Sequence, residues 1–569
     1  MDTSAADGPA AGESSVPNHD PARLDPSDPY AREEQTFPTL DDEQIDRLRH
    51  YGGQETVAAG ALLFERGQRG VDFFVITAGA VEIVEHDPAG GEKVFSTHGP
   101  GQFTGEMDLF NDREILVSGR AKGNGTVLRV PRDKFQTMLT GEPDIAEIVM
   151  RAFILRRTGL IQHEQGGVLV IGDEHDGETL RIMRFMTRNG YPHRHLGTAD
   201  PEVAREFPGE DFASGMLPAV VLPGRQILHN PKTPALADAL GLTEPFDPAE
   251  VFDVAIVGAG PGGLAAAVYA ASEGLKTIVL EGTAPGGQAG TSSKIENYLG
   301  FPTGISGQAL AGRAQAQAQK FGARLAIARA VEKLECAADP FVLRLEGDEV
   351  VNARSVIVAS GARYRKLDVP DYAKYEGQGI HYAATAMEAN LCGNEEVIVV
   401  GGGNSSGQAA VFLSRTAGHV HVLIRGEKLA ETMSDYLVQR IETSDKITLH
   451  PFTEVTGLAG DPLLDQVTWT DRKTGAATPN AVRNLFVMIG AEPNTDWLEG
   501  CLPLDEKGFV RTGRGADGKG LDSPFATSVP GVFAVGDVRS GSVKRVASSV
   551  GEGSVVVHAV HGFLNPVEG

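Results

Sequence analysis

The sequence predicts a multidomain α/β protein, and three observations support this prediction. Two apolar strands each lead into a glycine-rich turn and a helix of small residues, in DVAIVGAGPGG from Asp253 and in VIVVGGGNSSG from Val397. Upstream, many short strands are broken by glycine, as in FFVITAGAVEIVEH. Between these regions, a shorter stretch alternates strands and helices. We therefore expect two Rossmann-like domains, preceded by a β-roll domain and a small α/β domain.

Composition narrows the class of protein. The length of 569 residues allows three or four domains, and a hydrophobic content of 41% is typical of globular domains. The formal net charge of −25 disfavours nucleic acid and anionic membranes as partners, because both would be repelled. The opening MDTSAADGPAAGESS is acidic, unlike a signal peptide. The most apolar stretch, 254–271, contains glycines and Pro261, which fit a strand–turn–helix rather than a membrane span.

The chain has three cysteines, Cys336, Cys392 and Cys501. They are scattered and odd in number, and they form neither a CxxC pair nor a metal-ligand spacing. We therefore expect reduced cysteines, no metal site and a cytoplasmic protein.

The N-terminal part divides into a tail and a roll. Residues 1–37 are polar and punctuated by proline, which predicts a disordered acidic tail. Residues 38–160 contain the short strands, flanked by helix-like stretches, which predicts the β-roll. No helix-turn-helix pattern follows the roll, which argues against a transcription factor.

The run GPGQFTGEMDLFNDREILVSGRAKGNGTVLRV resembles the cyclic-nucleotide-binding roll of catabolite-activator-type regulators. That resemblance implies a pocket at Gly105 and Glu106, with Glu106 holding a ribose hydroxyl. It also places Ile115 where the phosphate-binding arginine belongs, with Arg113 two residues earlier. A buried phosphate without a cation is costly, so cyclic nucleotide binding is disfavoured. A module for docking, dimerisation or sensing another ligand is favoured instead.

Residues 166–245 form the small domain. The order of GVLVIG, ETLRIMRFMTRNGYP, LPAVVL, RQILHN and TPALADALGL resembles a thioredoxin or glutaredoxin fold, with Leu217-Pro218 at its cis-proline position. Where that fold carries active-site cysteines, this chain has GDEHDGET. A dithiol role is therefore excluded, and an adaptor or docking role is left. A generic small α/β module is the alternative.

The first glycine turn has the pattern of a dinucleotide site. Gly258 allows a tight turn, Gly260 lets the backbone approach a pyrophosphate, and Gly263 lets helix and strand pack closely. Pro261 opens the helix, whose N-terminus favours phosphate. Glu281 ends the second strand, where an acid holds the adenosine ribose.

Residues 253–569 resemble the low-molecular-weight thioredoxin reductases, through motifs in family order: GAGPGG, PGGQAGTSSKIENYLGFP, VIVASGARYRKL, VVGGGNS, FVMIGAEPNT and GVFAVGD. The resemblance implies an FAD domain at 250–368 and 489–569, an inserted NAD(P) domain at 369–488, and a homodimer. The implied FAD contacts are Gly287, Gln288, Asn297, Gly361, Gly536, Asp537, Arg545 and Val546. Arg545 beside the flavin would stabilise its anionic reduced form, and a solvent-facing arginine at a helix start is the alternative.

The second glycine turn predicts NAD(P)H binding. Gly401 and Gly403 keep the first two glycine roles, Asn404 and Ser405 begin the helix, and Ser406 takes the third glycine position. Its second strand ends in Arg425 rather than in an acid, which favours the 2′-phosphate of NADPH, with NADH as the alternative donor. Of the three arginines in the family's NADPH signature only Arg425 is kept, because Gly426 and Ala430 occupy the other places.

The segment HYAATAMEAN precedes this turn, at the place where the reductases carry CxxC. Alignment puts Ala383 and Ala386 at the two cysteine positions. We therefore predict an NAD(P)H-dependent FAD oxidoreductase that passes electrons from reduced flavin directly to a non-thiol acceptor: a quinone, oxygen or a redox protein. The alternatives are a flavin-containing sensor with little turnover and a thioredoxin-disulfide reductase that uses an external dithiol. The sequence does not identify the acceptor, and it predicts no side chain as catalytic.

Overall fold

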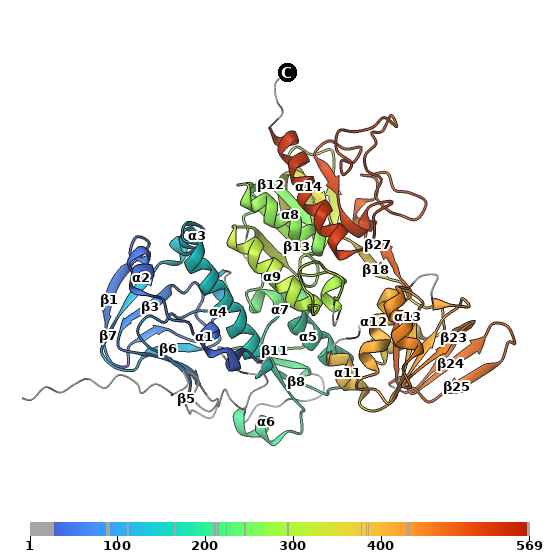
Figure 1. The fold of residues 1–569 in the computed structure, drawn as a ribbon, viewed down its shortest axis with the longest axis horizontal. Coiled ribbons are helices and arrows are strands. Elements are labelled where there is room, and N and C mark those ends of the chain that lie inside the picture. Colours follow the sequence, from blue (N-terminus) through green and yellow to red (C-terminus); the bar gives the residue numbers. More distant parts are fainter. Residues whose placement is uncertain are drawn as a thin grey trace, which may run out of the picture. The chain divides into compact units, whose positions relative to one another are not determined.

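A computed structural model gives the structure of the chain (Figure 1). It describes residues 28–86, 92–110, 113–163, 165, 167–208, 212, 216–223, 225–243, 246–292, 295–376, 378–382, 384, 386–429, 433–461 and 463–565. These residues form two compact units. The first takes the described parts of Met1–Asp173, Gly190–Glu244 and Gln319–Phe321, and the second those of Glu174–Asn189, Pro245–Ala318 and Gly322–Gly569. Over the described ranges, no helix is long and apolar enough to cross a membrane.

The first unit begins inside the segment predicted to be disordered. Residues 28–37 form η2 (Pro29–Arg32) and α1 (Glu33–Thr36), whereas the rest of that segment lies outside the described residues. Tyr30 is 2% exposed, stacks on His163 with ring centroids 4.8 Å apart, and donates from its hydroxyl to Gln165. The prediction of a tail up to residue 37 is therefore wrong for residues 28–37, because aromatic burial outweighs their polar composition.

The roll consists of two antiparallel sheets and three helices. One sheet has the order β1 (Gly53–Val57), β7 (Gly125–Val130) and β3 (Phe73–Ala78). The other has the order β2 (Leu62–Phe64), β6 (Ser118–Ala121), β4 (Val81–His86) and β5 (Glu92–His98). The helices are α2 (Asp42–Leu48), α3 (Arg132–Gly141) and α4 (Pro143–Gln162), with a 3-10 turn η3 (Met107–Phe110). Packed phenylalanines fill the core between them: Phe73, Phe103, Phe110, Phe135 and Phe153.

The small domain contributes a mixed four-stranded sheet to the first unit. Its order is β11 (Ile227–His229), β10 (Ala219–Val221), β8 (Val168–Ile171) and β9 (His193–Leu196). Strands β8 and β9 are parallel, and the other pairs are antiparallel. The Leu217–Pro218 peptide bond is cis. Helices α6 (Pro201–Glu206) and α7 (Thr233–Ala239) belong to this unit, whereas α5 (Gly177–Arg188) belongs to the second.

The second unit is built around two sheets, a larger mixed one and a smaller parallel one. The larger has the order β14 (Arg324–Ile327), β13 (Thr277–Glu281), β12 (Val251–Val257), β17 (Val350–Val358), β16 (Phe341–Leu345) and β15 (Val331–Glu335), and β28 (Val532–Ala534) also pairs with β17. Strands β12, β13, β14, β17 and β28 run parallel, whereas β16 is antiparallel to both its neighbours. The helices of this part are α8 (Pro261–Ser272), α9 (Gly307–Lys320) and α14 (Val546–Leu564).

The smaller parallel sheet has the order β19 (Ile380–His381), β26 (Asn484–Val487), β20 (Glu396–Val400), β21 (His419–Leu423) and β22 (Ile447–His450). An antiparallel sheet of β23 (Thr453–Ala459), β24 (Gln466–Asp471) and β25 (Ala477–Asn480) accompanies it. Its helices are α10 (Tyr372–Tyr375), α11 (Ala386–Cys392), α12 (Asn404–Leu413) and α13 (Asp435–Glu442). The chain leaves and re-enters the larger sheet's region through a two-stranded ribbon, β18 (Ala362–Tyr364) with β27 (Ala491–Pro493).

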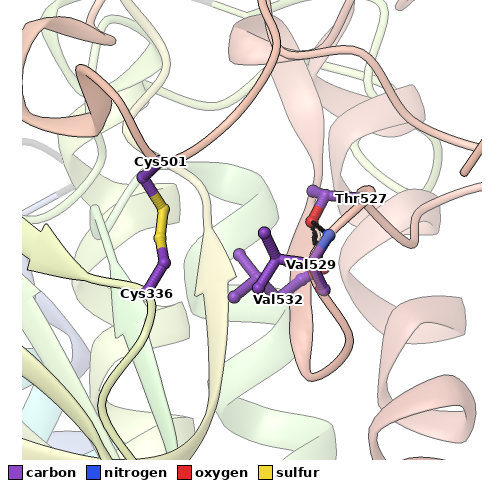
Figure 2. The surroundings of a disulfide bond; sticks show 5 residues. All are labelled: Cys336, Cys501, Thr527, Val529 and Val532. Atoms are coloured by element: carbon purple, nitrogen blue, oxygen red, sulfur yellow. Dashed lines mark hydrogen bonds between the residues drawn. A yellow bond between two sulfur atoms is a disulfide. The ribbon is translucent and has the colours of Figure 1, made fainter. Parts of the chain in front are cut away.

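Two cysteines are paired, which corrects the expectation that all are reduced. Cys336, just after β15, forms a disulfide with Cys501, and Figure 2 shows Val529 and Val532 beside it. Their Cα atoms are 5.7 Å apart, although the residues are 165 positions apart in sequence. Inspection of short spacings could not detect this pair, because the fold alone brings β15 next to the turn η7 (Asp496–Leu498).

Candidate active site

The first glycine turn joins β12 to α8, and two close approaches shape it. Gly258 has a φ of 104°, and a Cβ on it would lie 2.4 Å from the carbonyl oxygen of Ala359. A Cβ on Gly263 would lie 1.9 Å from the carbonyl oxygen of Gly258. A Cβ on Gly260 would meet nothing within 4 Å. The backbone at Gly260 is therefore open at the N-terminus of α8, which starts at Pro261, as pyrophosphate binding requires.

Glu281 lies at the end of β13, beside this turn. Its Oε2 accepts the N–H of Ala259 at 2.8 Å, and its Oε1 accepts the N–H of Thr283 at 2.9 Å. The N–H of Ala284 also donates to Oε1, at 3.3 Å. A carboxylate has about four acceptor positions, so one remains for a ribose hydroxyl. The side chain is thus held in place against the glycine turn and retains the capacity that the sequence assigns to it.

The loop after β13 returns to the same turn. Gly287 has a φ of 54°, and a Cβ on it would lie 3.1 Å from the Cα of Gly260. The Gln288 amide donates to the carbonyl oxygen of Ala362, in β18. The hydroxyl groups of Thr291 and Tyr364 lie 3.0 Å apart. These contacts bring the predicted residues Gly287 and Gln288 to the glycine turn and to the ribbon.

Gly361 and Asn297 have different surroundings. Gly361 has a φ of 64°, and its carbonyl oxygen accepts the N–H of Asn494 at 3.0 Å, which joins the end of β17 to the returning chain. Asn297 is exposed, as is Leu299 at 92%. The structure therefore brings Gly361 into the constellation and leaves Asn297 on the surface.

The returning segment after β28 is held by one acid on α14. Gly536 has a φ of 75°, and its N–H donates to Glu552 at 2.6 Å. Asp537 is half-buried, and burial raises its pKa, while the charge of Lys544 opposes this rise. The Lys544 ammonium donates to the carbonyl oxygen of Asp537. Asp537 is thereby fixed where the sequence predicts a contact with FAD.

Helices α8 and α14 cross closely near their N-termini and lie side by side in Figure 1. A Cβ on Gly553 would lie 2.1 Å from the carbonyl oxygen of Gly262, and one on Gly262 would lie 3.2 Å from that of Ser549. Both N-termini therefore lie at the same end of the crossing, where their partial positive charges add. Val546 is the first residue of α14, and Arg545 before it is exposed.

The second glycine turn repeats the first with one substitution. Gly401 has a φ of 137°, and a Cβ on it would lie 2.3 Å from the carbonyl oxygen of Met488. Gly403 is open, because a Cβ there would meet nothing within 4 Å. Ser406 is fully buried, and its hydroxyl donates to the carbonyl oxygen of Gly401. Ser406 therefore takes the third glycine position. It bonds to the Gly401 carbonyl, which is equivalent to the Gly258 carbonyl that Gly263 approaches in the first turn.

Asn404, Ser405 and Arg425 line the surface of this second turn. Asn404 and Ser405 are exposed at the start of α12, and the Asn404 amide oxygen accepts the N–H of Ser434 at 2.7 Å. Register pairs Val257 with Leu280 and Val400 with Leu423. The position equivalent to Glu281 is therefore Ile424, which is buried, and the exposed Arg425 follows it.

The segment without thiols lies between β19 and β20. Ala383 lies outside the described residues, and Ala386 is the first residue of α11. Cys392, at the end of α11, is fully buried and donates from Sγ to the carbonyl oxygen of Glu388 at 3.0 Å. Burial raises the pKa of this thiol to about 12, so Cys392 is an inert packing residue.

Two tyrosines that sequence reasoning missed stack at the start of this segment. Tyr382 and Tyr364 have ring centroids 5.4 Å apart and planes within 8° of parallel. Tyr364 comes from the ribbon, and Tyr382 directly precedes the first alanine of the segment. No periodic signal marks them, because each lies in a short irregular stretch.

Helix α5 supplies a second set of contacts that the sequence did not predict. Arg184 donates to Nδ1 of His381 at 3.3 Å and lies 3.5 Å from Glu388. His381 donates from Nε2 to Asn484 at 3.0 Å, and burial together with the Arg184 charge lowers its pKa to about 4. The histidine is therefore neutral. The other end of α5 reaches the loop after β13, where Arg188 donates to the carbonyl oxygen of Gly287 at 3.4 Å.

In the roll, the predicted nucleotide residues have other partners. Gly105 has a φ of 106°, and Glu106 receives Arg157 from α4 at 2.7 and 2.5 Å. Arg113 is 6% exposed and lies 6.0 Å from the ring centroid of Tyr191.

Comparison with known proteins identifies the family of the second unit. The sequence profile described as pyridine nucleotide-disulphide oxidoreductase matches residues 252–553. The chain belongs to this family. It is an FAD-dependent pyridine nucleotide oxidoreductase. A second profile, described as the cyclic nucleotide-binding domain, matches residues 54–142 and supports the β-roll assignment.

Thioredoxin reductases are among its relatives in the family. That of Mycolicibacterium smegmatis is 35% identical over 304 residues, which cover 53% of this chain and 93% of the relative. The NADPH-dependent thioredoxin reductase 3 of Arabidopsis thaliana is 33% identical over 55% of this chain and 58% of the relative. The crystal structure of the Lactococcus lactis thioredoxin reductase has a TM-score of 0.50 and 30% identity, and the match covers 55% of this chain and 99% of that one.

The residues present fit FAD at the first turn. The open backbone at Gly260 and the adjacent helix N-termini suit a pyrophosphate, and Glu281 and Asp537 offer acceptors for hydroxyl groups. The sequence-predicted glycines, Gln288 and both acids are therefore assembled around one end of the larger sheet.

Proposed function

We propose that this protein passes electrons from NADPH, through bound FAD, to an acceptor that is not a thiol. The observation that carries the proposal is the absence of a usable thiol in the segment that corresponds to the CxxC of the reductases. HYAATAMEAN contains no cysteine, and the nearby Cys392 is buried and hydrogen-bonded, with a raised pKa. A dithiol relay of the kind that the reductases use has no residues to form it there.

The remaining two cysteines lie away from the glycine turn. Register places Glu335 opposite Val342 and Val342 opposite Asn352. The carboxyl end of β17 is Val358, and at about 3.3 Å per residue the strand from Asn352 to that end spans about 20 Å. The Cys336–Cys501 disulfide is therefore at a different level of the sheet from the turn that holds the cofactor, which supports a structural role for it.

FAD, when bound, accepts two electrons from a pyridine nucleotide and can release them one or two at a time. The chain positions the group and its surroundings. Gly260 and Gly287 leave room for close backbone approach, and the N-termini of α8 and α14 offset negative charge. Direct electron transfer from the flavin to an acceptor needs no redox-active side chain.

The tyrosine pair favours a planar acceptor such as a quinone. Tyr364 and Tyr382 are stacked and partly exposed, and Tyr382 directly precedes Ala383, the position of the first missing thiol. A flat acceptor ring can stack on this pair, because offset aromatic contacts are favourable at centroid separations of about 4.5–7 Å. Tyr382→Ala should therefore slow electron transfer to a quinone more than it slows reduction of the flavin by NADPH.

NADPH is the donor that the second turn favours. The acid that would hold a ribose diol is replaced by the buried Ile424, and the exposed Arg425 follows it, where a guanidinium can pair with a 2′-phosphate. Arg425→Gln should raise the KM for NADPH more than the KM for NADH.

The domain boundaries and assembly complete the proposal. We assign 38–160 to the roll, 166–245 without α5 to the thioredoxin-like domain, 250–368 and 489–569 to the FAD domain, and 369–488 to the NAD(P) domain. We also propose a homodimer, as the resemblance to the low-molecular-weight thioredoxin reductases implies.

An acceptor panel tests the function. The purified protein is assayed with NADPH against a benzoquinone, ferricyanide, oxygen and an oxidised thioredoxin, as the wild type, Cys392→Ser, and Cys336→Ser with Cys501→Ser. We expect turnover with a non-thiol acceptor that every cysteine variant retains. Turnover with thioredoxin that disappears in a cysteine variant would reject the proposal, and flavin that NADPH cannot reduce would favour the sensor alternative.

A further inference from the structure

The β-roll of the first unit contains a cavity whose lining is mostly apolar. The strands and α4 supply an apolar wall around it. That wall includes Phe64, Ile83, Phe95, Leu116 and Leu160.

The cavity does not have the groups that a cyclic nucleotide needs. Both Glu106 oxygens are already used: Arg157 donates to both, and the N–H groups of Met107 and Asp108 donate at 2.8 and 3.3 Å. The position of the phosphate-binding arginine is Ile115, which lines the cavity with an apolar side chain. Arg113 lies instead against Tyr191. A ribose and a cyclic phosphate would therefore lack their partners here.

The same wall carries buried polar atoms that have no partner among the described residues. One is Oδ2 of Asp108, whose other oxygen accepts from Arg157, and the others are Nδ1 of His98, Oγ1 of Thr104 and Nη2 of Arg156. His98, Thr104 and Arg156 are 2%, 1% and 7% exposed. A buried polar group without a partner is unfavourable, so a ligand that pairs with these atoms gains affinity.

Arg156 is the centre of this group. Its other nitrogens donate to the carbonyl oxygens of Thr36, Phe103 and Gly105, and no carboxylate in the described chain forms an ion pair with it. Burial lowers its pKa to about 9, and the charge of Glu106 opposes this only in part. A buried guanidinium with a free N–H pair favours an anion of low charge.

His98 and Thr104 line the same cavity as Arg156 and share neighbours with it. Thr104 stands between Phe103 and Gly105, the two residues whose carbonyls Arg156 binds. Arg156 lies 5.3 Å from the ring centroid of Phe37, and the His98 ring lies 5.6 Å from the same ring. Burial and the Arg156 charge keep His98 neutral by lowering its pKa, so one ring nitrogen can donate.

We propose that the roll binds a small apolar monocarboxylic acid, with its carboxylate on Arg156, Thr104 and His98 and its hydrocarbon or aromatic part between Phe64, Phe95 and Leu116. The apolar walls exclude water from the chain of the ligand, and the three donors select a carboxylate over an alcohol. This assigns the domain a ligand of a class different from cyclic nucleotides.

Calorimetric titration of the full-length holoprotein tests the proposal. The probes are hexanoate, octanoate, decanoate and phenylacetate, with 1-octanol and cAMP as comparison compounds. We expect at least one carboxylate to bind at least tenfold more tightly than 1-octanol and cAMP. Binding of cAMP in preference to every carboxylate, or no heat with any of the four acids, would overturn it.

Two variants separate the site from a general effect on folding. Thr104→Val removes a hydroxyl that has no partner in the ligand-free protein, so the fold should be kept while carboxylate affinity falls at least threefold, and Thr104→Ser should restore it. Arg156→Met should remove selectivity for the acid over the alcohol. Carboxylate binding that neither variant changes would place the ligand elsewhere and reject the assignment.

Discussion

Gly260 offers the sharpest separation between folding and cofactor binding. A Cβ added there would meet nothing within 4 Å, and its φ of −70° and ψ of −179° suit any residue. Gly260 is the N-cap of α8, where replacing glycine by alanine costs roughly 0.5–1 kcal/mol of unfolding free energy. Gly263→Ala instead would force its Cβ to 1.9 Å from a backbone oxygen, and overpacking of this kind costs about 1–3 kcal/mol or more.

The affinity for FAD should not follow the order of these stability costs, because Gly260→Ala is mild for folding but acts directly at the cofactor site. At Gly260 the added methyl group would occupy the space that the pyrophosphate needs, so we expect Gly260→Ala to weaken FAD at least tenfold, about 1.4 kcal/mol. Gly312→Ala, in α9 of the same domain with no neighbour within 4 Å, is the matched control and should keep its flavin. The assays are the flavin-to-protein absorbance ratio, reconstitution with FAD and thermal unfolding of the apoprotein. Gly260→Ala protein with wild-type FAD affinity would refute the assignment of this turn.

Three further predictions concern other parts of the second unit. Ser406→Ala should destabilise the protein by about 1 kcal/mol, measured by denaturant unfolding, because the Gly401 carbonyl loses its buried donor; an unchanged midpoint would contradict that role. His381 has a pKa of about 4 in the folded chain, against an ordinary value of 6.5. Between these pH values the unfolded chain binds more protons than the folded chain. The free energy of unfolding should therefore fall by about 3 kcal/mol as the pH drops from 6.5 to 4. His381→Gln should flatten this pH dependence, and an equally steep profile would exclude the histidine. Replacing Cys336 and Cys501 by serine should cost about 2–4 kcal/mol without changing flavin reduction by NADPH, and a slower reduction would place the disulfide on the electron path.

The sequence was sufficient for features that local chemistry determines. Gly258 and Gly263 fit only glycine because backbone atoms approach them, and that requirement produces a recognisable spacing. Ser406 was predicted to replace a glycine through its small size, and the structure adds that its hydroxyl bonds to Gly401. The family assignment followed from the same motifs.

Long-range packing was outside the reach of sequence reasoning. The Cys336–Cys501 pair joins segments that only the folded sheet brings together. Helix α5 was expected to belong with the thioredoxin-like domain, but Arg184 and Arg188 attach it to the second unit through contacts that leave no periodic pattern. Asn297 and Arg545 were transferred from the family pattern, and both are exposed, so their roles toward FAD stay predictions.

The number of electrons taken up per flavin tests the absence of a dithiol most directly. The holoprotein is titrated with NADPH under anaerobic conditions while the flavin absorbance is followed to its endpoint. We predict complete bleaching after one NADPH per FAD, which corresponds to two electrons and a flavin as the only redox group. An endpoint at two NADPH per FAD would show that a disulfide is reduced together with the flavin, and the proposed direct transfer to a non-thiol acceptor would be wrong.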